Sequence, residues 1–351
     1  MKLITFLSAL LISQASFAFT IEKIGGDISH PWGMSVLNDE EVLVTARAGA
    51  LLRINLKTGQ QRAVLPTPFV ASFRQGGLLD VAYDSDTNQV HLCYSKPLET
   101  GAGLAIASAE LDGHQLSNLR DIFTSNHRSS SGSHFGCRLV IDGDYLFASL
   151  GDRGDRTNAQ IPSNHAGSII RLNLVNPEPA NSQPGWLSQI YSIGHRNPQG
   201  LTLQPKTRLL WAHEHGPRGG DEINLIEQNR NYGWPTVSYG KEYIGGDIGL
   251  NSSPNGYTDP LWIWDPSIAP SGMTFYTGDM FPEWRGDLLV GALKFTSIYR
   301  LVIDPATNKP ISEERLFNDE MGRVRDVEQA NDGSILVLSD APNGGLYRIS
   351  R

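Results

Sequence analysis

The sequence of 351 residues contains only two cysteines, Cys93 and Cys137, and beyond its first 18 residues it has no apolar run long enough to cross a membrane. Two cysteines do not make a disulfide scaffold, although they could form one disulfide in an oxidising compartment. Basic side chains are outnumbered, because 29 Lys and Arg stand against 37 Asp and Glu, for a formal net charge of −8. A net-acidic surface is a poor match for a polyanion, so we expect neither nucleic acid nor an anionic membrane as a partner.

Several motifs of cofactor and nucleotide chemistry are also missing. The chain has no Gly-x-Gly-x-x-Gly after a strand, no P-loop, no Gly-x-Ser-x-Gly and no Cys-x-x-Cys. These absences disfavour nicotinamide or flavin binding by the usual fold, nucleotide hydrolysis and α/β-hydrolase chemistry.

The N-terminus has the pattern of a cleavable secretory signal. Lys2 precedes an apolar stretch over residues 3–18, which ends in the small-x-small tripeptide Ser-Phe-Ala. We therefore expect a signal peptide over residues 1–18, a single mature domain over residues 19–351, and a periplasmic or secreted location. The sequence leaves open whether the mature chain is a monomer or a homodimer.

Sustained helical periodicity is nearly absent, whereas short apolar-alternating runs separated by turn residues recur throughout. Six of these runs begin between 47 and 79 residues apart: VLVTA (42–46), VHLCY (90–94), YLFAS (145–149), LLWAH (209–213), LLVGA (288–292) and ILVLS (335–339). Another short apolar strand precedes each of them: GMSVL (33–37), LLDVAY (78–83), CRLVI (137–141), GLTLQ (200–204), GMTFY (272–276) and VRDVEQ (324–329).

Six strand–turn–strand units at this spacing predict an all-β protein, a six-bladed β-propeller with four-stranded antiparallel blades. Third strands are expected at residues 51–56, 169–174, 298–303 and 346–350, and TIEKI (20–24) is expected to close the last blade. The excursion over residues 235–265 is interpreted as an insertion in a blade. A β-sandwich with accidental regularity is the alternative.

In a propeller, residues just before the first strand and just after the second strand of each blade share one rim near the axis. The polar residues ahead of first strands are Trp32, Arg74, Gln75, His134, His195, Arg196, Ser267, Arg323 and Arg325. Those behind second strands are Arg47, Asp152, His215, Lys294 and Asp340. We therefore expect these distant segments to converge on one site.

Four cations of this set stand out: Arg196, Lys294, Arg323 and Arg325. Guanidinium groups bind carboxylates through paired hydrogen bonds and lysine adds a point charge, so the implied ligand is a small polyanion with several carboxylates. The alternative is that the cations form salt bridges between blades, with Asp152, Asp326 and Asp340 as partners.

His134 is the candidate proton acceptor of this rim. An imidazole that titrates near neutrality suits removal of a hydroxyl proton, and Asp152 could hold the ring in the right tautomer. Taken alone, a histidine is more often structural, so this hypothesis depends on the rest of the set.

The segment over residues 211–235 is dense in polar residues and indicates a metal. A tight turn at Gly216 and Pro217 can expose backbone carbonyls, and Asp221 and Glu222 add carboxylates, which suits calcium. Zinc at His213 and His215 is disfavoured because no third ligand stands at a recognised spacing. An acidic turn without metal remains open.

Eight segments together resemble a known family. They are RQGGLLDVAY (74–83), HFGCRL (134–139), LGDRGDR (150–156), GHRNPQGL (194–201), HEHGPRGGDEINLIEQNRNYGWP (213–235), PSIAPSGMTFY (266–276), GALK (291–294) and GRVRDV (322–327). In this order they resemble the soluble PQQ-dependent aldose sugar dehydrogenases of the glucose/sorbosone dehydrogenase family.

The resemblance implies a six-bladed propeller that holds pyrroloquinoline quinone (PQQ) and Ca²⁺, oxidises aldoses and passes the electrons to an external acceptor. His134 matches the catalytic base, Asp152 its supporting carboxylate and Arg196 the arginine near the reactive carbonyl of the quinone. Positions that contact the cofactor match Gln75, His134, Arg196, Ser267, Lys294, Arg323 and Arg325. Gly216 and Pro217 match the ligands of a cofactor-side calcium, and Glu222 and Tyr232 match ligands of a second, structural calcium.

Two rival functions remain at this stage, a calcium-dependent propeller lactonase and a non-catalytic propeller that binds a partner. A cationic axis disfavours the first, and the second leaves His134, Asp152 and Arg196 without a role. The chain is also short for the family's glucose dehydrogenases, which favours a broad aldose preference.

Overall fold

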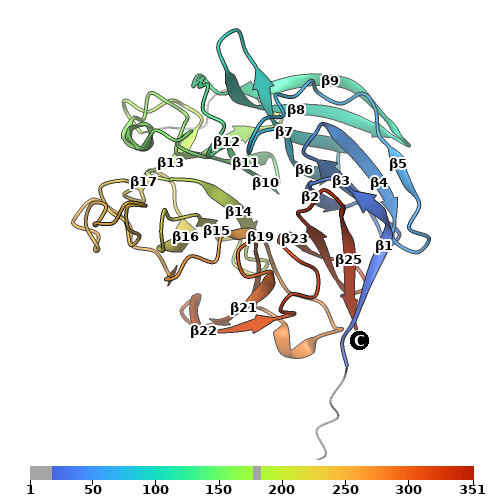
Figure 1. Cartoon of the computed structure of the whole chain (residues 1–351). Coiled ribbons are helices and arrows are strands. Elements are labelled where there is room, and N and C mark those ends of the chain that lie inside the picture. Colours follow the sequence, from blue (N-terminus) through green and yellow to red (C-terminus); the bar gives the residue numbers. More distant parts are fainter. Residues whose placement is uncertain (1–17, 177–182) are drawn as a thin grey trace, which may run out of the picture.

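The computed structural model describes residues 18–176 and 183–351, and within these residues the chain forms six β-sheets around a central axis (Figure 1). Residues 1–17 of the expected signal peptide lie outside the described residues. The helices of the described ranges are two short 3₁₀ turns, η1 (Arg156–Gln160) and η2 (Pro282–Trp284), and neither is long and apolar enough to span a membrane. The expected all-β, six-bladed propeller is confirmed.

Each blade runs from an inner strand at the axis to an outer strand. Blades 1 to 3 consist of β2 (Pro31–Val36), β3 (Glu41–Ala46), β4 (Ala50–Asn55) and β5 (Gln61–Ala63); β6 (Leu78–Asp84), β7 (Gln89–Pro97), β8 (Ala102–Asp112) and β9 (Gln115–Thr124); and β10 (Gly136–Asp142), β11 (Tyr145–Leu150), β12 (Ser168–Asn173) and β13 (Ile190–Ile193), with β17 (Arg230–Asn231) added in parallel.

Blades 4 to 6 follow in the same order. They consist of β14 (Pro198–Leu203), β15 (Leu210–Glu214), β16 (Asp221–Ile226) and β18 (Trp262–Trp264); β19 (Pro270–Phe275), β20 (Leu288–Ala292), β21 (Ser297–Asp304) and β22 (Lys309–Leu316); and β23 (Val324–Gln329), β24 (Ile335–Ser339), β25 (Gly344–Ser350) and β1 (Thr20–Ile28).

The ring is closed by strands from both ends of the chain. β1 pairs antiparallel with β25, with Thr20 opposite Ser350, as the sequence predicted for TIEKI. The excursion at residues 235–265 contains β18, so part of this insertion supplies the outer strand of blade 4. Closure inside one blade leaves no open end in the ring.

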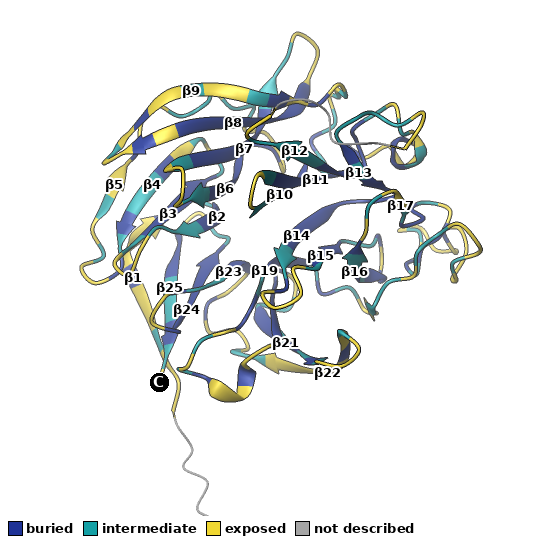
Figure 2. Ribbon diagram, turned by 180° about the vertical axis from the view of Figure 1, so that it is seen from behind, coloured by how far each residue is buried: buried dark blue, intermediate teal, exposed yellow. Residues whose placement is uncertain are grey.

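The strand pattern follows burial. Inner and second strands are mostly buried, since both of their faces pack against neighbouring blades, whereas the outer strands β5, β9 and β22 are largely exposed (Figure 2). The core therefore lies between blades as a series of apolar clusters. In the cluster between blades 2 and 3, Cys93 of β7 and Cys137 of β10 form a disulfide. This bond answers the question that the sequence left open for the two cysteines.

Strand direction separates two faces of the ring. Gln75 and His134 precede β6 and β10, while Asp84 and Asp142 end these strands. The loops before the first strands and after the second strands therefore meet on one face, and the turns between first and second strands lie on the opposite face (Figure 1).

Candidate active site

A cavity of about 870 Å³ lies on the face where these loops meet. Loops of blades 2 to 5 line it. Seven expected site residues are among its lining: Gln75, His134, Arg196, Gly216, Pro217, Ser267 and Lys294. Four cations, Arg196, Arg218, Lys241 and Lys294, stand on its walls against one carboxylate, Asp265. The cavity thus carries an excess of positive charge in a net-acidic chain, which suits an anionic ligand.

His134 and Asp152 are in direct contact at its edge. His134 Nδ1 lies 2.6 Å from Asp152 Oδ1, and the indole N–H of Trp234 donates to Asp152 Oδ2 at 2.8 Å. Because a carboxylate only accepts hydrogen bonds, the proton of a neutral His134 ring sits on Nδ1 and Nε2 is left as an acceptor. This arrangement can remove a proton from a hydroxyl bound in the cavity.

The backbone of His134 is also held. Its N–H donates to Gln75 Oε1 at 2.7 Å, which ties the loop of blade 3 to that of blade 2. His134 has a φ of +52°, in the left-handed region that residues other than glycine adopt uncommonly. Gly151 makes this possible, since a Cβ there would stand 2.2 Å from the carbonyl oxygen of His134.

Arg196 enters the cavity from blade 4 and is nearly buried. Its Nη1 donates to the carbonyl oxygens of His215 at 2.9 Å and Gly216 at 3.0 Å, and its guanidinium lies 5.3 Å from the centre of the Trp234 ring. Glu214 accepts from the backbone N–H of Arg196 and from the ring of His195. A single buried carboxylate therefore orients the segment that carries Arg196.

The Gly216–Pro217 turn is anchored by Asp221. This buried carboxylate accepts from the N–H groups of Gly216 and Ala269, each at 2.8 Å, and from the hydroxyl of Ser267. Gly216 has no room for a side chain, because a Cβ would lie 2.3 Å from the carbonyl oxygens of Gly219 and Gly220. Asp221 of blade 4 thus ties the backbone of this turn to the loop that leads into blade 5.

His215 lines the same wall of the cavity, and its ring is a neutral hydrogen-bond donor. Burial lowers its pKa to about 4, and the positive charges of Arg196 and Arg325 act in the same direction, while Asp221 opposes them. Its Nε2 lies 2.6 Å from the carbonyl oxygen of Pro270, which requires the proton on that nitrogen. His215 therefore adds no charge to the cavity near neutral pH.

Glu222 and Tyr232 lie beside a second, much smaller cavity of about 10 Å³, which Glu214 also lines. Glu214 and Glu222 are partners in the register of β15 and β16. Burial raises the pKa of Glu222 well above its usual range, and the charge of Glu214 adds to this effect. The Tyr232 hydroxyl accepts from the N–H of Glu227 and donates to the carbonyl oxygen of Leu225, so it is already occupied.

Arg323 and Arg325 are placed differently from the other expected cations, because neither is among the residues that line the larger cavity. Arg325 donates to Asp340 at 3.0 Å and to Gln199, and Arg323 lies 3.5 Å from the same carboxylate. The sequence alternative named Asp340 as a salt-bridge partner, and the structure shows this pairing, but within blade 6 and not between blades. The positive charge of Arg325 nevertheless helps to lower the pKa of His215, which lines the cavity.

Three contributors were not assigned these roles by sequence reasoning: Trp234 on Asp152, Glu214 beneath Arg196, and Asp221 as the anchor of the turn. Glu214 had a usable signal, because it stands between two histidines at the end of a predicted strand, opposite the segment with Glu222. Nothing in the local pattern of Trp234 indicates a contact 82 residues away.

Comparison with known proteins places this site in a family context. The aldose sugar dehydrogenase YliI of Escherichia coli is 35% identical over 362 residues, which cover 99% of this chain and 96% of that protein. Quinoprotein glucose dehydrogenase B of Acinetobacter calcoaceticus is 27% identical over 411 residues, covering 92% of this chain and 85% of that protein.

Solved structures agree in shape as well as sequence. The crystal structure of the soluble aldose sugar dehydrogenase from Escherichia coli in the apo form superposes with a TM-score of 0.90 at 33% identity, over 95% of this chain and 99% of that chain. Residues 28–348 match the family described as glucose/sorbosone dehydrogenase. With the fold and these likenesses in agreement, the chain belongs to the glucose/sorbosone dehydrogenase family, whose named relatives here are oxidoreductases.

Proposed function

We propose that this chain is a periplasmic PQQ-dependent aldose sugar dehydrogenase, which oxidises the anomeric carbon of aldoses to lactones and passes the electrons to an external acceptor. The observation that carries the proposal is the contact of His134 with Asp152 at the edge of a cationic cavity, in a chain of this family. The names of the relatives support the substrate class and the quinone cofactor.

The residues of the cavity fit PQQ. PQQ is a flat quinone with three carboxylates, and the walls offer an excess of cations together with hydrogen-bonding side chains. Gln75, Arg196, Ser267 and Lys294 would hold it, with Arg323 and Arg325 contributing from blade 6. When bound, PQQ supplies the group that accepts a hydride from the sugar.

The chain's own residues then supply positioning and proton transfer. His134 Nε2 takes the proton of the anomeric hydroxyl, and Asp152 stabilises the imidazolium that forms. Arg196 places positive charge in the wall where negative charge develops during hydride transfer. Gln75 keeps the His134 backbone in place through this proton transfer.

Calcium is proposed at two places. The carbonyl oxygens of Gly216 and Pro217 would bind one ion beside the cofactor. In the structure the Gly216 carbonyl accepts a hydrogen bond from Arg196. Glu222 would bind the second ion together with Tyr232, which would use its backbone carbonyl because its hydroxyl is already hydrogen-bonded. Glu214 completes a pair of buried carboxylates at an ion-sized cavity. Two buried carboxylates without a cation repel each other, which supports a divalent ion there.

The proposal includes secretion. We infer that residues 1–18 are removed and that residues 19–351 form the mature domain. The Cys93–Cys137 disulfide supports an oxidising compartment, since such bonds persist outside the cytosol.

The test uses the mature chain, purified without cofactor. Addition of PQQ and calcium should allow a panel of aldoses to reduce an artificial dye. No reduction with any aldose would refute the function, and lactone hydrolysis with calcium alone would favour a lactonase instead.

His134→Ala tests the base. This variant should lose turnover almost completely while its PQQ binding, followed by titration of cofactor absorbance, remains close to wild type. His114→Ala, in the turn between β8 and β9 on the opposite face, is the matched control and should retain turnover. Substantial turnover in His134→Ala would refute the assignment of the base.

A further inference from the structure

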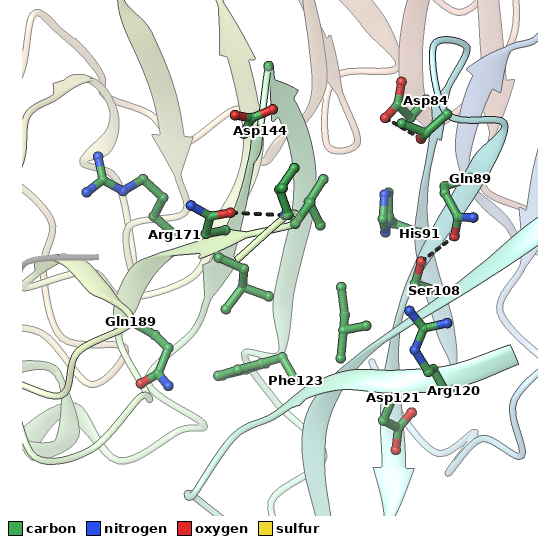
Figure 3. Close-up of a pocket in the computed structure, with 17 residues that line it drawn as sticks. Asp84, Gln89, His91, Ser108, Arg120, Asp121, Phe123, Asp144, Arg171 and Gln189 are labelled. Carbon is green, nitrogen blue, oxygen red and sulfur yellow. Dashed lines mark hydrogen bonds between the residues drawn. The ribbon is translucent and has the colours of Figure 1, made fainter. Parts of the chain in front are cut away.

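A third cavity, of about 660 Å³, lies between blades 2 and 3 and takes no part in the proposed reaction (Figure 3). Its lining includes Asp84 at the end of β6 and Asp144 in the turn between β10 and β11. These positions belong to the face opposite the one with His134. The cavity is therefore separate from the candidate active site.

Blade 2 provides a polar wall. Gln89 and His91 are two residues apart on β7 and so face the same side. Ser108 of β8 is the register partner of His91, and Arg120 of β9 is the register partner of Ser108. The Ser108 hydroxyl donates to Gln89 Oε1 at 2.9 Å. Four polar side chains thus stand together on a sheet face that normally packs against the next blade with apolar groups (Figure 3).

His91 is the unusual member of this wall. It is 2% exposed, and neither of its ring nitrogens has a hydrogen-bond partner among the residues that the structure describes. Burial lowers its pKa to about 4, with Asp84 opposing, so the ring is neutral and presents one donor and one acceptor. A buried polar group left unpaired costs about 1–3 kcal/mol, which a ligand hydroxyl would recover.

Blade 3 and the end of β9 provide the apolar part of the lining, beside the polar side chains of Asp144, Arg171 and Gln189. Leu172, Leu174, Ile122 and Phe123 line the cavity and belong to the apolar cluster between the two blades. Cys93 lies two residues beyond His91 on the same side of β7, and its disulfide to Cys137 joins the blades beside the cavity. The spacing of the two walls is therefore fixed by a covalent bond, which favours a preformed binding site.

The charges of the lining nearly cancel. Asp84, Asp121 and Asp144 stand against Arg120 and Arg171, and Asp121 is already paired with Lys96. The cavity therefore favours neither an anionic nor a cationic ligand. Mixed donors and acceptors around an apolar patch match a molecule with a hydroxyl edge and a C–H face.

We propose that the cavity between blades 2 and 3 binds a neutral sugar, with its hydroxyls on Gln89, His91 and Arg120 and its C–H face on Leu172 and Phe123. This site is distinct from the catalytic cavity and does not depend on PQQ. A chain with two sugar sites can remain attached to a polymeric or abundant carbohydrate while it turns over another sugar unit.

The test measures binding of maltose to the mature chain without PQQ, by isothermal titration calorimetry. We expect a dissociation constant of about 1 mM or tighter, weakened at least tenfold in the double variant Gln89→Ala/Arg120→Ala. Arg62→Ala, an exposed arginine on the outer strand β5, is the matched control and should bind as wild type does. Dye-linked turnover with PQQ should be unchanged in all three proteins, which separates this proposal from the catalytic one.

A second readout does not depend on a variant. Maltose should shift the ring ¹⁵N signals of His91 in histidine-labelled wild-type protein, because the ring gains hydrogen bonds. Absence of binding, binding that the double variant retains, or unchanged His91 signals under saturating maltose would each overturn the proposal. A crystal soaked in maltose that shows only ordered water at His91 would overturn it as well.

Discussion

Trp234 donates its indole N–H to Asp152 Oδ2 at 2.8 Å, on the oxygen that His134 does not use. The other oxygen, Oδ1, accepts from the N–H of Gly154 at 2.7 Å as well as from His134. Asp152 is 1% exposed, so these donors replace the water that would otherwise solvate its charge. Trp234 therefore acts as a positioning residue for the carboxylate that orients His134.

Replacement of Trp234 by Phe tests this role. The variant keeps the aromatic ring but removes the N–H, so Asp152 loses a charge-assisted hydrogen bond and holds His134 less firmly. We expect kcat of dye-linked aldose oxidation to fall about tenfold, equivalent to roughly 1.4 kcal/mol in the barrier, with little change in KM. Steady-state kinetics on the reconstituted enzyme measures both constants.

The control is Trp262→Phe, which removes an indole N–H that donates to Glu313, and neither of these residues lines the cavity. It should leave kcat unchanged. Equal losses in the two variants, or a loss confined to KM in Trp234→Phe, would contradict the positioning role.

Calcium should stabilise the chain through Glu222. An ion that binds the folded state and not the unfolded one raises the melting temperature with its concentration. We expect calcium to raise the melting temperature of protein treated first with a chelator, and Glu222→Gln to lose most of this increase. Glu320→Gln, an exposed carboxylate outside both cavities, should keep it. A full calcium response in Glu222→Gln would show that the ion binds elsewhere.

Much of the fold could be predicted from the sequence, because the inner and second strands of a propeller are short apolar runs between turns. VLVTA and ILVLS, for example, were predicted as second strands and form most of β3 and β24. The site was partly accessible for the same reason. Once strand direction is known, Gln75, His134 and Lys294 must lie on one rim, and all three line the same cavity.

The rest of the site could not be predicted, because a strand pattern does not show which of several possible partners a side chain contacts. Arg325 stands on the predicted rim, but whether it faces a ligand or pairs with Asp340 is decided by the exact path of two loops. The contact of Trp234 with Asp152 depends on the course of the segment after β17, which lacks periodicity. The cavity beside His91 could not be predicted, because VHLCY has the pattern of an ordinary buried strand.

The pair of Arg325 and Asp340 predicts a dependence of stability on pH. Burial opposes the charge of Asp340, but Arg325 and the ring of His30 outweigh it and hold the pKa of this carboxyl well below its usual range. A lowered pKa adds stability that is complete above the unfolded value near 4 and is lost as pH falls towards the folded value. Asp340→Asn should therefore lower the free energy of unfolding by about 1–3 kcal/mol at pH 7, and by progressively less below pH 4.

Urea unfolding of wild type and variant between pH 3 and pH 7 measures this difference. Asp279→Asn breaks the exposed pair with Arg285 and should change the free energy of unfolding by less than about 0.5 kcal/mol. A difference for Asp340→Asn that stays constant across this range would contradict the ionised pair.

The disulfide between Cys93 and Cys137 should contribute strongly to stability, because it closes a chain segment of 44 residues and joins two blades in their apolar interface. Cys93→Ala/Cys137→Ala should lower the free energy of urea unfolding by about 2–4 kcal/mol. Wild type unfolded in the presence of dithiothreitol should show the same loss, whereas the double variant should not respond to the reductant. A wild type indifferent to dithiothreitol throughout the transition would mean that the two sulfurs are not bonded in solution, and the cavity beside His91 would lose its covalent support.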